Sequence, residues 1–371
     1  MFKRREPVRS ESLFRNWRGW LAHILILGTA ACDGGGRGAN EEPPVGDIPA
    51  GPVPSSEALF VSEGAILTPD PGEWDARFDD GSAGTIVEKN GSVFLYYIGA
   101  DGDRASDGGP AHRKLGVATA SSLSRPWTKH ASNPILEHSP NDDEEEGFWR
   151  ICAMVDDDGT ILLYATVLTG SGGKVRGDIQ LFTSTDGVNF TAERVVLAHD
   201  DEQVFGSGDE LGALGIYKAT DDRYHLYYTA KAPDINWVLG HASGPTRDTF
   251  TDSEEAYAPG FEVGHGSNPI LIDGTVFIPV QDNSGAIEIH ATTEAALGTF
   301  GAIAASYPSL ATDMGSLYLR DRWYLIASND SEGMGPVELH TAAAVTSSYG
   351  PAPVGVLIGD ETRERILPLP F

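Results

Sequence analysis

One unit recurs five times along this chain: a short apolar strand, a turn that contains Asp or Asn, and a second apolar strand. Each unit is followed by a second half that ends on an aromatic residue, and these aromatics lie 63, 60, 50 and 49 residues apart. The five units span residues 84–99, 153–166, 214–230, 269–280 and 315–328, and the closing aromatics are Trp127, Phe190, Phe250, Phe300 and Tyr349. No long stretch has the 3.6-residue period of a helix.

A repeat of this length that holds four short strands is typical of a β-propeller blade. Each blade must bury both faces against its neighbours, which explains why the inner strands are almost continuously apolar. We therefore expect an all-β fold, a single five-bladed β-propeller over residues 57–371, with the recurring aromatics packed between blades. The segment 57–67, EALFVSEGAIL, should close the ring against the last blade.

The first residues follow the order of a secretory signal: a basic start, a short apolar run, then small residues. The run is too short to span a bilayer as a mature helix. Thr29-Ala30-Ala31 before Cys32 resembles a bacterial lipobox, although Thr29 replaces its usual Leu. We expect residues 1–31 to be a signal peptide and Cys32 to carry lipid. The protein would then be anchored to the bacterial cell envelope, in the periplasm or at the cell surface. An ordinary signal peptide that contains a Cys is the alternative.

Residues 32–56 are rich in Gly and Pro and contain almost no large apolar side chains, so they predict a disordered tether. Acidic residues outnumber basic ones 54 to 26, and the net charge of −28 argues against a nucleic-acid partner. No phosphate-binding Gly loop, Gly-x-Ser-x-Gly elbow or zinc-spaced Cys/His cluster is present. We expect no cofactor and no metal site, with a cation on the propeller axis as the one open alternative.

Two stretches resemble known propeller enzymes. The segment 74–136, which includes GSVFLYYIGA, KLGVATASSLSRPW and SRPWTKHASNPIL, is similar to the first blade of glycoside hydrolase families 43, 32 and 68 and the related mannoside phosphorylases. The segment 262–280, EVGHGSNPILIDGTVFIPV, is similar to the fourth blade of family 43. This resemblance implies an oligo- or polysaccharide substrate in an axial pocket. It also implies inverting hydrolysis, with an Asp base, a Glu acid and a second Asp that tunes the acid.

The catalytic pattern of those families fits this sequence only in part. Where the family has the base, this chain has Ala83, so Asp79 or Asp80 just upstream would have to take that role; solvated loop carboxylates are the alternative. The tuning Asp falls on Ala153. Glu210 lies about two residues before the family's acid position, which keeps it on the same strand face. Glu210 is therefore the candidate general acid, with an ordinary loop Glu as the alternative.

Four further residues stand where the predicted inner strands begin. Trp149 could stack on a sugar ring or pack in the core, and Arg150 could bind a hydroxyl or a carboxylate. His265, between two glycines, and Asp313, which occupies the place of the family's Asp-Pro, are further substrate-binding candidates. We expect His265 and Asp313 to face a shared axial cavity.

The sequence thus predicts an exported, glycan-active protein, most simply a glycoside hydrolase. Two alternatives stay open. The gaps at Ala83 and Ala153 favour a non-catalytic glycan-binding lipoprotein of the same fold. A glycoside phosphorylase would need a basic phosphate site, for which Arg150 is one candidate.

Overall fold

A computed structural model gives the fold of the chain. It describes residues 60–78, 84–101, 112–124, 126–137, 146–171, 174–202, 204–206, 208, 210–232, 235–255, 263–282, 284–299, 301, 303–307, 313–319, 322–328 and 335–342. All of them belong to one compact unit, Asp47–Phe371. The predicted signal peptide, Cys32, the tether, Asp79 and Asp80 lie outside the described residues, so those predictions and the domain boundaries stay untested.

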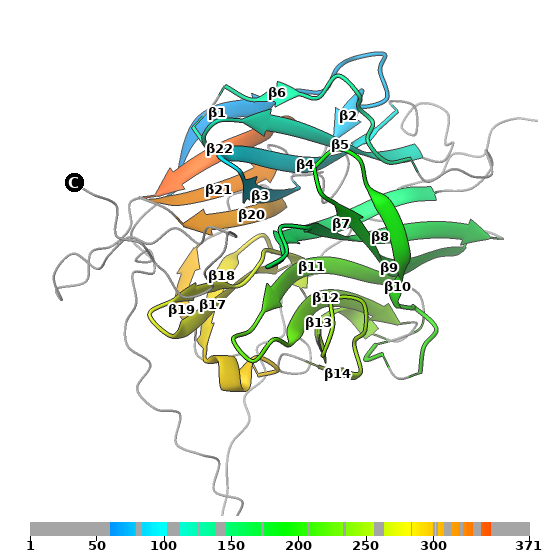
Figure 1. The fold of residues 1–371 in the computed structure, drawn as a ribbon, viewed down its shortest axis with the longest axis vertical. Helices are drawn as coiled ribbons and strands as arrows, with labels where there is room; N and C mark the ends of the chain where they lie inside the picture. The colour runs from blue at the N-terminus through cyan, green and yellow to red at the C-terminus, as the bar shows by residue number, and fades with distance from the viewer. Residues whose placement is uncertain are drawn as a thin grey trace, which may run out of the picture. The chain divides into compact units, whose positions relative to one another are not determined.

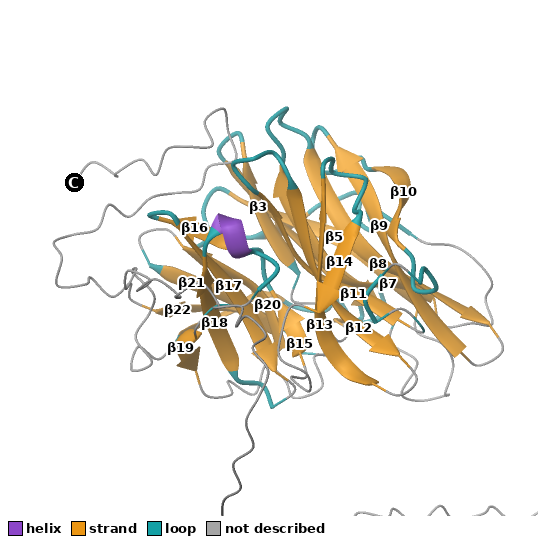
Figure 2. Ribbon diagram, turned by 90° about the horizontal axis from the view of Figure 1, so that it is seen from below, coloured by secondary structure: helices purple, strands orange, loops and turns teal. Residues whose placement is uncertain are grey.

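The described residues form almost nothing but β-strands, with a single 3₁₀ turn, η1 (Glu294–Ala296) (Figure 2). None of the described helices is long and apolar enough to cross a membrane. Blades one and two each contain four antiparallel strands in chain order. Blade one has β3 (Thr85–Lys89), β4 (Ser92–Ala100), β5 (His112–Ala120) and β6 (Thr128–Lys129), with β2 (Arg77–Phe78) also paired to β4; blade two has β7 (Glu146–Val155), β8 (Ile161–Ser171), β9 (Lys174–Ser184) and β10 (Thr191–Leu197).

Blades three and four repeat this arrangement, and blade five takes its outer strand from the start of the domain. The strands are β11 (Glu210–Lys218), β12 (Tyr224–Ala232), β13 (Ile235–Gly244) and β14 (Asp252–Glu255) in blade three; β15 (Val263–Gly266), β16 (Ile270–Ile272), β17 (Thr275–Asp282), β18 (Ile287–Thr292) and β19 (Ile303–Tyr307) in blade four; and β20 (Asp313–Leu319), β21 (Trp323–Ser328), β22 (Val337–Ala342) and β1 (Val61–Leu67) in blade five.

The ring closes as the sequence predicted, because β1 pairs antiparallel with β22, from Val61 opposite Thr341 to Leu67 opposite Val337. The inner strands also contact one another in a cycle that runs β3, β7, β11, β15, β20 and back to β3. Figure 1 shows the strand groups side by side, with β3, β7, β11 and β20 nearest their common centre. The predicted five-bladed β-propeller is therefore confirmed.

The apolar core follows directly from this geometry. It divides into five clusters, and each cluster fills the space between two adjacent blades. Each sheet therefore buries both faces, as the continuous apolar strands require. Three of the recurring aromatics pack between blades as predicted, while Phe300 and Tyr349 fall outside the described residues. Phe190 lies edge-on to Tyr96 of blade one at 5.5 Å, Phe250 lies edge-on to Tyr164 of blade two at 6.1 Å, and Trp127 packs on the cluster between blades five and one.

Near the centre, the blades are joined by hydrogen bonds between side chains and the backbone of the inner strands. An inner strand has no partner strand on its central edge, so its N–H groups need other acceptors. Thr85 Oγ1 accepts from the Ala153 N–H at 3.2 Å, and Thr166 Oγ1 accepts from the Ala213 N–H at 2.9 Å. Asn268 accepts from Ile216 N–H on blade three at 3.0 Å and donates to Ala153 O on blade two at 2.6 Å. These bonds fix the relative positions of the blades near the centre.

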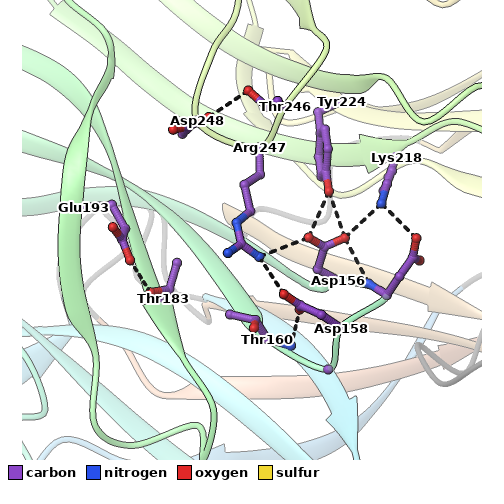
Figure 3. A network of polar contacts seen from close by, with 12 residues as sticks. Asp156, Asp158, Thr160, Thr183, Glu193, Lys218, Tyr224, Thr246, Arg247 and Asp248 are labelled. Atoms are coloured by element: carbon purple, nitrogen blue, oxygen red, sulfur yellow. Dashed lines mark hydrogen bonds and ion pairs between the residues drawn. The ribbon is translucent and has the colours of Figure 1, made fainter.

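A buried polar network joins blades two and three at the end of β7 that lies away from Trp149 and Arg150 (Figure 3). The carboxylate of Asp156 lies 2.8 Å from the Tyr224 hydroxyl, 3.1 Å from Lys218 Nζ and 3.2 Å from Arg247 Nη1. Burial opposes the ionisation of Asp156. Hydrogen bonds from the Asp157 N–H, Tyr224 and Lys218 outweigh burial and lower the pKa of Asp156 below its ordinary value. The network stabilises the contact between the two blades.

Candidate functional site

The candidate residues within the described part of the chain lie near the starts of four inner strands. Trp149 and Arg150 belong to β7, Glu210 opens β11, His265 lies in β15 and Asp313 opens β20. Because these strands run side by side around the centre, their first residues gather at one end of the ring. The site is therefore assembled from four blades.

Arg150 has the most unusual backbone of the group. It has a φ of +48°, a left-handed conformation that is uncommon for a residue with a side chain. It is also the extra residue of a β-bulge, since Trp149 pairs with Thr166 and Ile151 pairs with Ala165. From the bulge, the Arg150 side chain reaches residues of blades three and four. Such strain is common at functional sites and costs about 1 kcal/mol or more, which neighbouring contacts must offset.

Gly212 of β11 makes room for the Arg150 side chain. A Cβ at Gly212 would lie 2.7 Å from Arg150 Cδ and 2.6 Å from Thr229 Oγ1, closer than real Cβ contacts allow. Glycine at this position therefore lets the arginine stem lie directly on the inner strand of blade three. Gly212 lies two residues after Glu210 in β11, so this contact places Arg150 against the start of the same strand as Glu210.

The polar end of Arg150 contacts blade four. Arg150 Nη1 lies 2.9 Å from His265 Nδ1, and His265 Nε2 lies 3.3 Å from Asp313 Oδ1. Arg150 is 7% and His265 8% exposed, whereas the Asp313 side chain is 25% exposed. His265 and Asp313 therefore lie at the same end of the ring, while the predicted axial cavity that they would share stays a prediction. The structure therefore orders a cation, an imidazole and a carboxylate in one line across three blades.

Trp149 lies beside this line and is itself buried. The Arg150 guanidinium carbon is 4.3 Å from the centre of its ring, and the ring of Trp237, from β13, is 5.0 Å away at a tilt of 52°. Trp149 is 6% exposed, so a sugar ring would reach it only if one of these neighbours moved. The structure thus gives Trp149 a packing role; sugar stacking by this residue stays a prediction.

Glu210 lies on the blade-three side of the site. Its side chain is 18% exposed, and its Oε1 lies 3.6 Å from Lys231 Nζ, on the neighbouring strand β12. Lys231 Nζ also lies 5.2 Å from the centre of the Trp237 ring. Sequence reasoning missed Lys231, Trp237 and Gly212. Only the register of β11 with β12 and β13 identifies them, because their sequence surroundings are those of ordinary strand residues.

Two observations concern the two carboxylates of the family pattern that this chain lacks, the base and the tuning Asp. Asp75, another carboxylate upstream of blade one, is 2% exposed and lies 2.6 Å from Lys129 Nζ, so its ion pair holds it within blade one. Ala153 lies in β7 and carries no polar side chain, which leaves the family's tuning carboxylate without a counterpart there. Asp79 and Asp80 stay predictions because neither is described. Among the described residues, no group of three or more His, Cys, Asp or Glu side chains is placed to hold a metal ion.

Comparison with known proteins now adds to this geometry. No protein-family model and no curated protein sequence matches the chain. Solved structures do match. The chain aligns with a β-1,2-mannobiose phosphorylase from Listeria innocua in complex with β-1,2-mannobiose at 12% identity, with a TM-score of 0.55 over 77% of this chain and 97% of that one. The fold is that of the five-bladed β-propeller glycosidases.

Two other solved structures agree. One comes from the GH130 family of mannoside phosphorylases, which is described as containing glycoside hydrolases that target β-1,2 mannosidic linkages in Candida mannan. It is 12% identical to this chain, with a TM-score of 0.56 over 78% of this chain and 96% of that one. The other is a GH43 β-1,3-galactosidase with galactodeoxynojirimycin, 9% identical, with a TM-score of 0.52 over 76% and 94%. At these identities the likeness establishes the fold alone.

Proposed function

We propose that this protein is an exported enzyme that cleaves a glycosidic bond at the end of the propeller where Glu210, Arg150, His265 and Asp313 gather. The observation that carries the proposal is the line of Arg150, His265 and Asp313, held across three blades by contacts of 2.9 and 3.3 Å. A left-handed arginine buried against a histidine needs support from its surroundings, and such support is typical of a binding site. The shared fold with glycoside hydrolases and phosphorylases supports the substrate class.

In this proposal Glu210 protonates the leaving glycosidic oxygen, and Asp79 or Asp80 activates the attacking water. Inverting hydrolysis needs the two carboxyl groups roughly 6.5–9.5 Å apart, so that a water molecule fits between the base and the sugar. Asp313, a quarter exposed, would accept hydrogen bonds from sugar hydroxyls. His265 would hold that carboxylate in place, and Arg150 would hold His265.

A second candidate reaction is phosphorolysis, in which inorganic phosphate replaces the attacking water. The specific observation in its favour is the presence of two cationic side chains at the same end of the ring, Arg150 and Lys231, with His265 beside Arg150. Cationic donors are what a phosphate ion requires. The absence of a carboxylate at Ala153 favours instead a glycan-binding protein without activity.

One assay separates these three functions. The full-length protein is incubated with β-1,2-mannobiose and with arabinan, xylan, fructan, galactan and mannan, with and without inorganic phosphate. Hydrolysis releases free sugars without phosphate, phosphorolysis releases a sugar 1-phosphate only with phosphate, and a binding protein releases neither. The proposed enzyme is refuted if no substrate is consumed under either condition while binding persists.

The role of Glu210 has its own test. Glu210→Gln removes the proton donor while keeping the shape of the side chain, so the rate on a natural glycan should fall on the order of 10²-fold or more. An aryl glycoside with an acidic leaving group needs little protonation and should be cleaved at nearly the wild-type rate. Full activity of the variant on natural glycans would refute the assignment.

We also propose that Cys32 becomes the lipid-bearing N-terminus of the mature protein. The apolar run, the small residues before Cys32 and the Gly/Pro-rich residues after it support this proposal. Mass spectrometry of the membrane fraction should find a diacylglycerol-modified peptide that begins at Cys32. A mature chain that begins at any other residue would contradict it.

A further inference from the structure

Blade three presents a second aromatic side chain at the same end of the ring as Glu210. Trp237 lies near the start of β13 and is partly exposed. The partly exposed aromatics that pack between blades, Trp127, Phe190 and Phe250, each contact one of the five apolar clusters, whereas Trp237 belongs to none of these clusters. Burying an indole would stabilise the fold more than leaving it partly in water. Packing within the apolar clusters between blades therefore does not account for where Trp237 lies.

The neighbours of Trp237 fix its position relative to the site. On one side its ring packs on Trp149, which is in turn covered by Arg150. On the other side lies Lys231, whose Nζ is 5.2 Å from the Trp237 ring centre and 3.6 Å from Glu210 Oε1. The Lys231 side chain is 44% exposed, so its ammonium can move to another acceptor at little cost. Trp237 is thus packed on one side against a buried indole and contacted on the other side by an exposed lysine.

We propose that Trp237, together with Lys231, binds the sugar on the leaving-group side of the scissile bond. This inference rests on the proposed function, because it takes Glu210 as the acid that protonates the leaving oxygen. The sugar attached to that oxygen must then lie against the surface beyond Glu210, where Lys231 and Trp237 stand. The C–H face of a pyranose stacks on an indole, and the Lys231 ammonium donates hydrogen bonds to the sugar hydroxyls.

The Trp237 indole should affect kcat/KM only for substrates whose leaving group is a sugar. We expect Trp237→Leu to lower kcat/KM for an oligosaccharide by about 2- to 10-fold, the range that an aromatic contact supplies. It should leave kcat/KM for the glycosyl fluoride of the same sugar unchanged, because fluoride has no ring to stack. Trp237→Phe should restore most of the loss. Trp127→Leu, which changes a partly buried indole between blades five and one, serves as the matched control and should leave both substrates unaffected.

Binding is measured separately, so that a failure of this inference is distinguishable from a failure of the proposed function. Affinity electrophoresis of wild type, Trp237→Leu and Trp127→Leu in gels that contain mannan, galactan, arabinan, xylan or fructan needs no turnover. Retardation that weakens only in Trp237→Leu supports the subsite even if no sugar is released. Equal retardation of all three proteins, no retardation of the wild type in any gel, or equal losses on oligosaccharide and fluoride would overturn it. Thermal unfolding of each variant confirms that it is folded.

Discussion

Two histidines buried side by side in blade three should make the protein sensitive to acid. His225 Nδ1 lies 3.0 Å from His241 Nε2, and the two rings stack at 5.2 Å with an angle of 19°. Burial lowers the pKa of His225 to about 4, although Asp221 and Glu294 partly oppose this effect. Burial, with the charge of His225, lowers the pKa of His241 to about 3. Both imidazoles are therefore neutral in the folded protein at neutral pH.

The lowered pKa values determine both the direction and the size of the change in unfolding free energy with pH. An unfolded histidine has a pKa of about 6.5, so below that pH the unfolded chain binds protons that the folded chain does not. The contribution of this pair to the free energy of unfolding should be constant above about pH 7 and should fall between pH 6.5 and pH 4. At pH 5 the difference between a folded pKa of about 4 and an unfolded pKa of about 6.5 corresponds to about 2 kcal/mol for one imidazole. Two imidazoles set an upper limit of about 4 kcal/mol.

Urea unfolding at pH 7.5 and at pH 5 tests this expectation. The double variant His225→Gln, His241→Gln keeps a polar pair that cannot titrate in this range, so it should lose about 2 to 4 kcal/mol less than the wild type between the two pH values. The control His130→Gln changes an imidazole outside the pair and should retain the wild-type loss. An equal loss of stability in the wild type and the double variant would refute the assignment of acid sensitivity to this pair.

Three further predictions concern the inner strands. Gly212→Ala should displace the Arg150 side chain and lower glycan turnover by roughly 10-fold, the effect of moving a positioning group out of place; turnover equal to wild type would show that the contact is not needed. Asp156→Asn should lower the free energy of unfolding at pH 7 by about 3 kcal/mol, because Lys218 would lose its buried counter-ion and keep only the exposed Asp157, and the deficit should shrink in acid as the wild-type carboxylate becomes protonated; urea titrations at pH 7 and pH 3 measure both effects. Asp313→Asn should weaken glycan binding and leave the unfolding free energy within about 1 kcal/mol of wild type, since the side chain is a quarter exposed; a larger loss of stability would assign it a structural role.

The sequence by itself determined the fold of this protein. Strand pairs joined by short turns are local features, and they recur at a spacing that is typical of propeller blades. The strand over 57–67 had to pair somewhere, and the incomplete last repeat was the one sheet edge in need of a partner, as the pairing of β1 with β22 confirms. The position of His265 and Asp313 at one end of the ring also followed from the repeat, because both lie near the start of an inner strand.

The tertiary structure alone decided how the site is assembled. The alternation of side chains along a strand predicts which face of the sheet each residue lies on only where no extra residue is inserted. A register shift interrupts this alternation in four of the inner strands, β7, β11, β15 and β20. Each shift exchanges the two faces for the residues that precede it. The contact between Arg150 and His265 joins residues 115 positions apart, and no local pattern encodes it. Lys231 reaches Glu210, and Trp237 reaches Lys231, only because two hairpin strands bring them to the same end of blade three. The sequence repeat specifies which strands lie next to the centre of the ring, whereas the bulges within each blade determine which of their side chains face it.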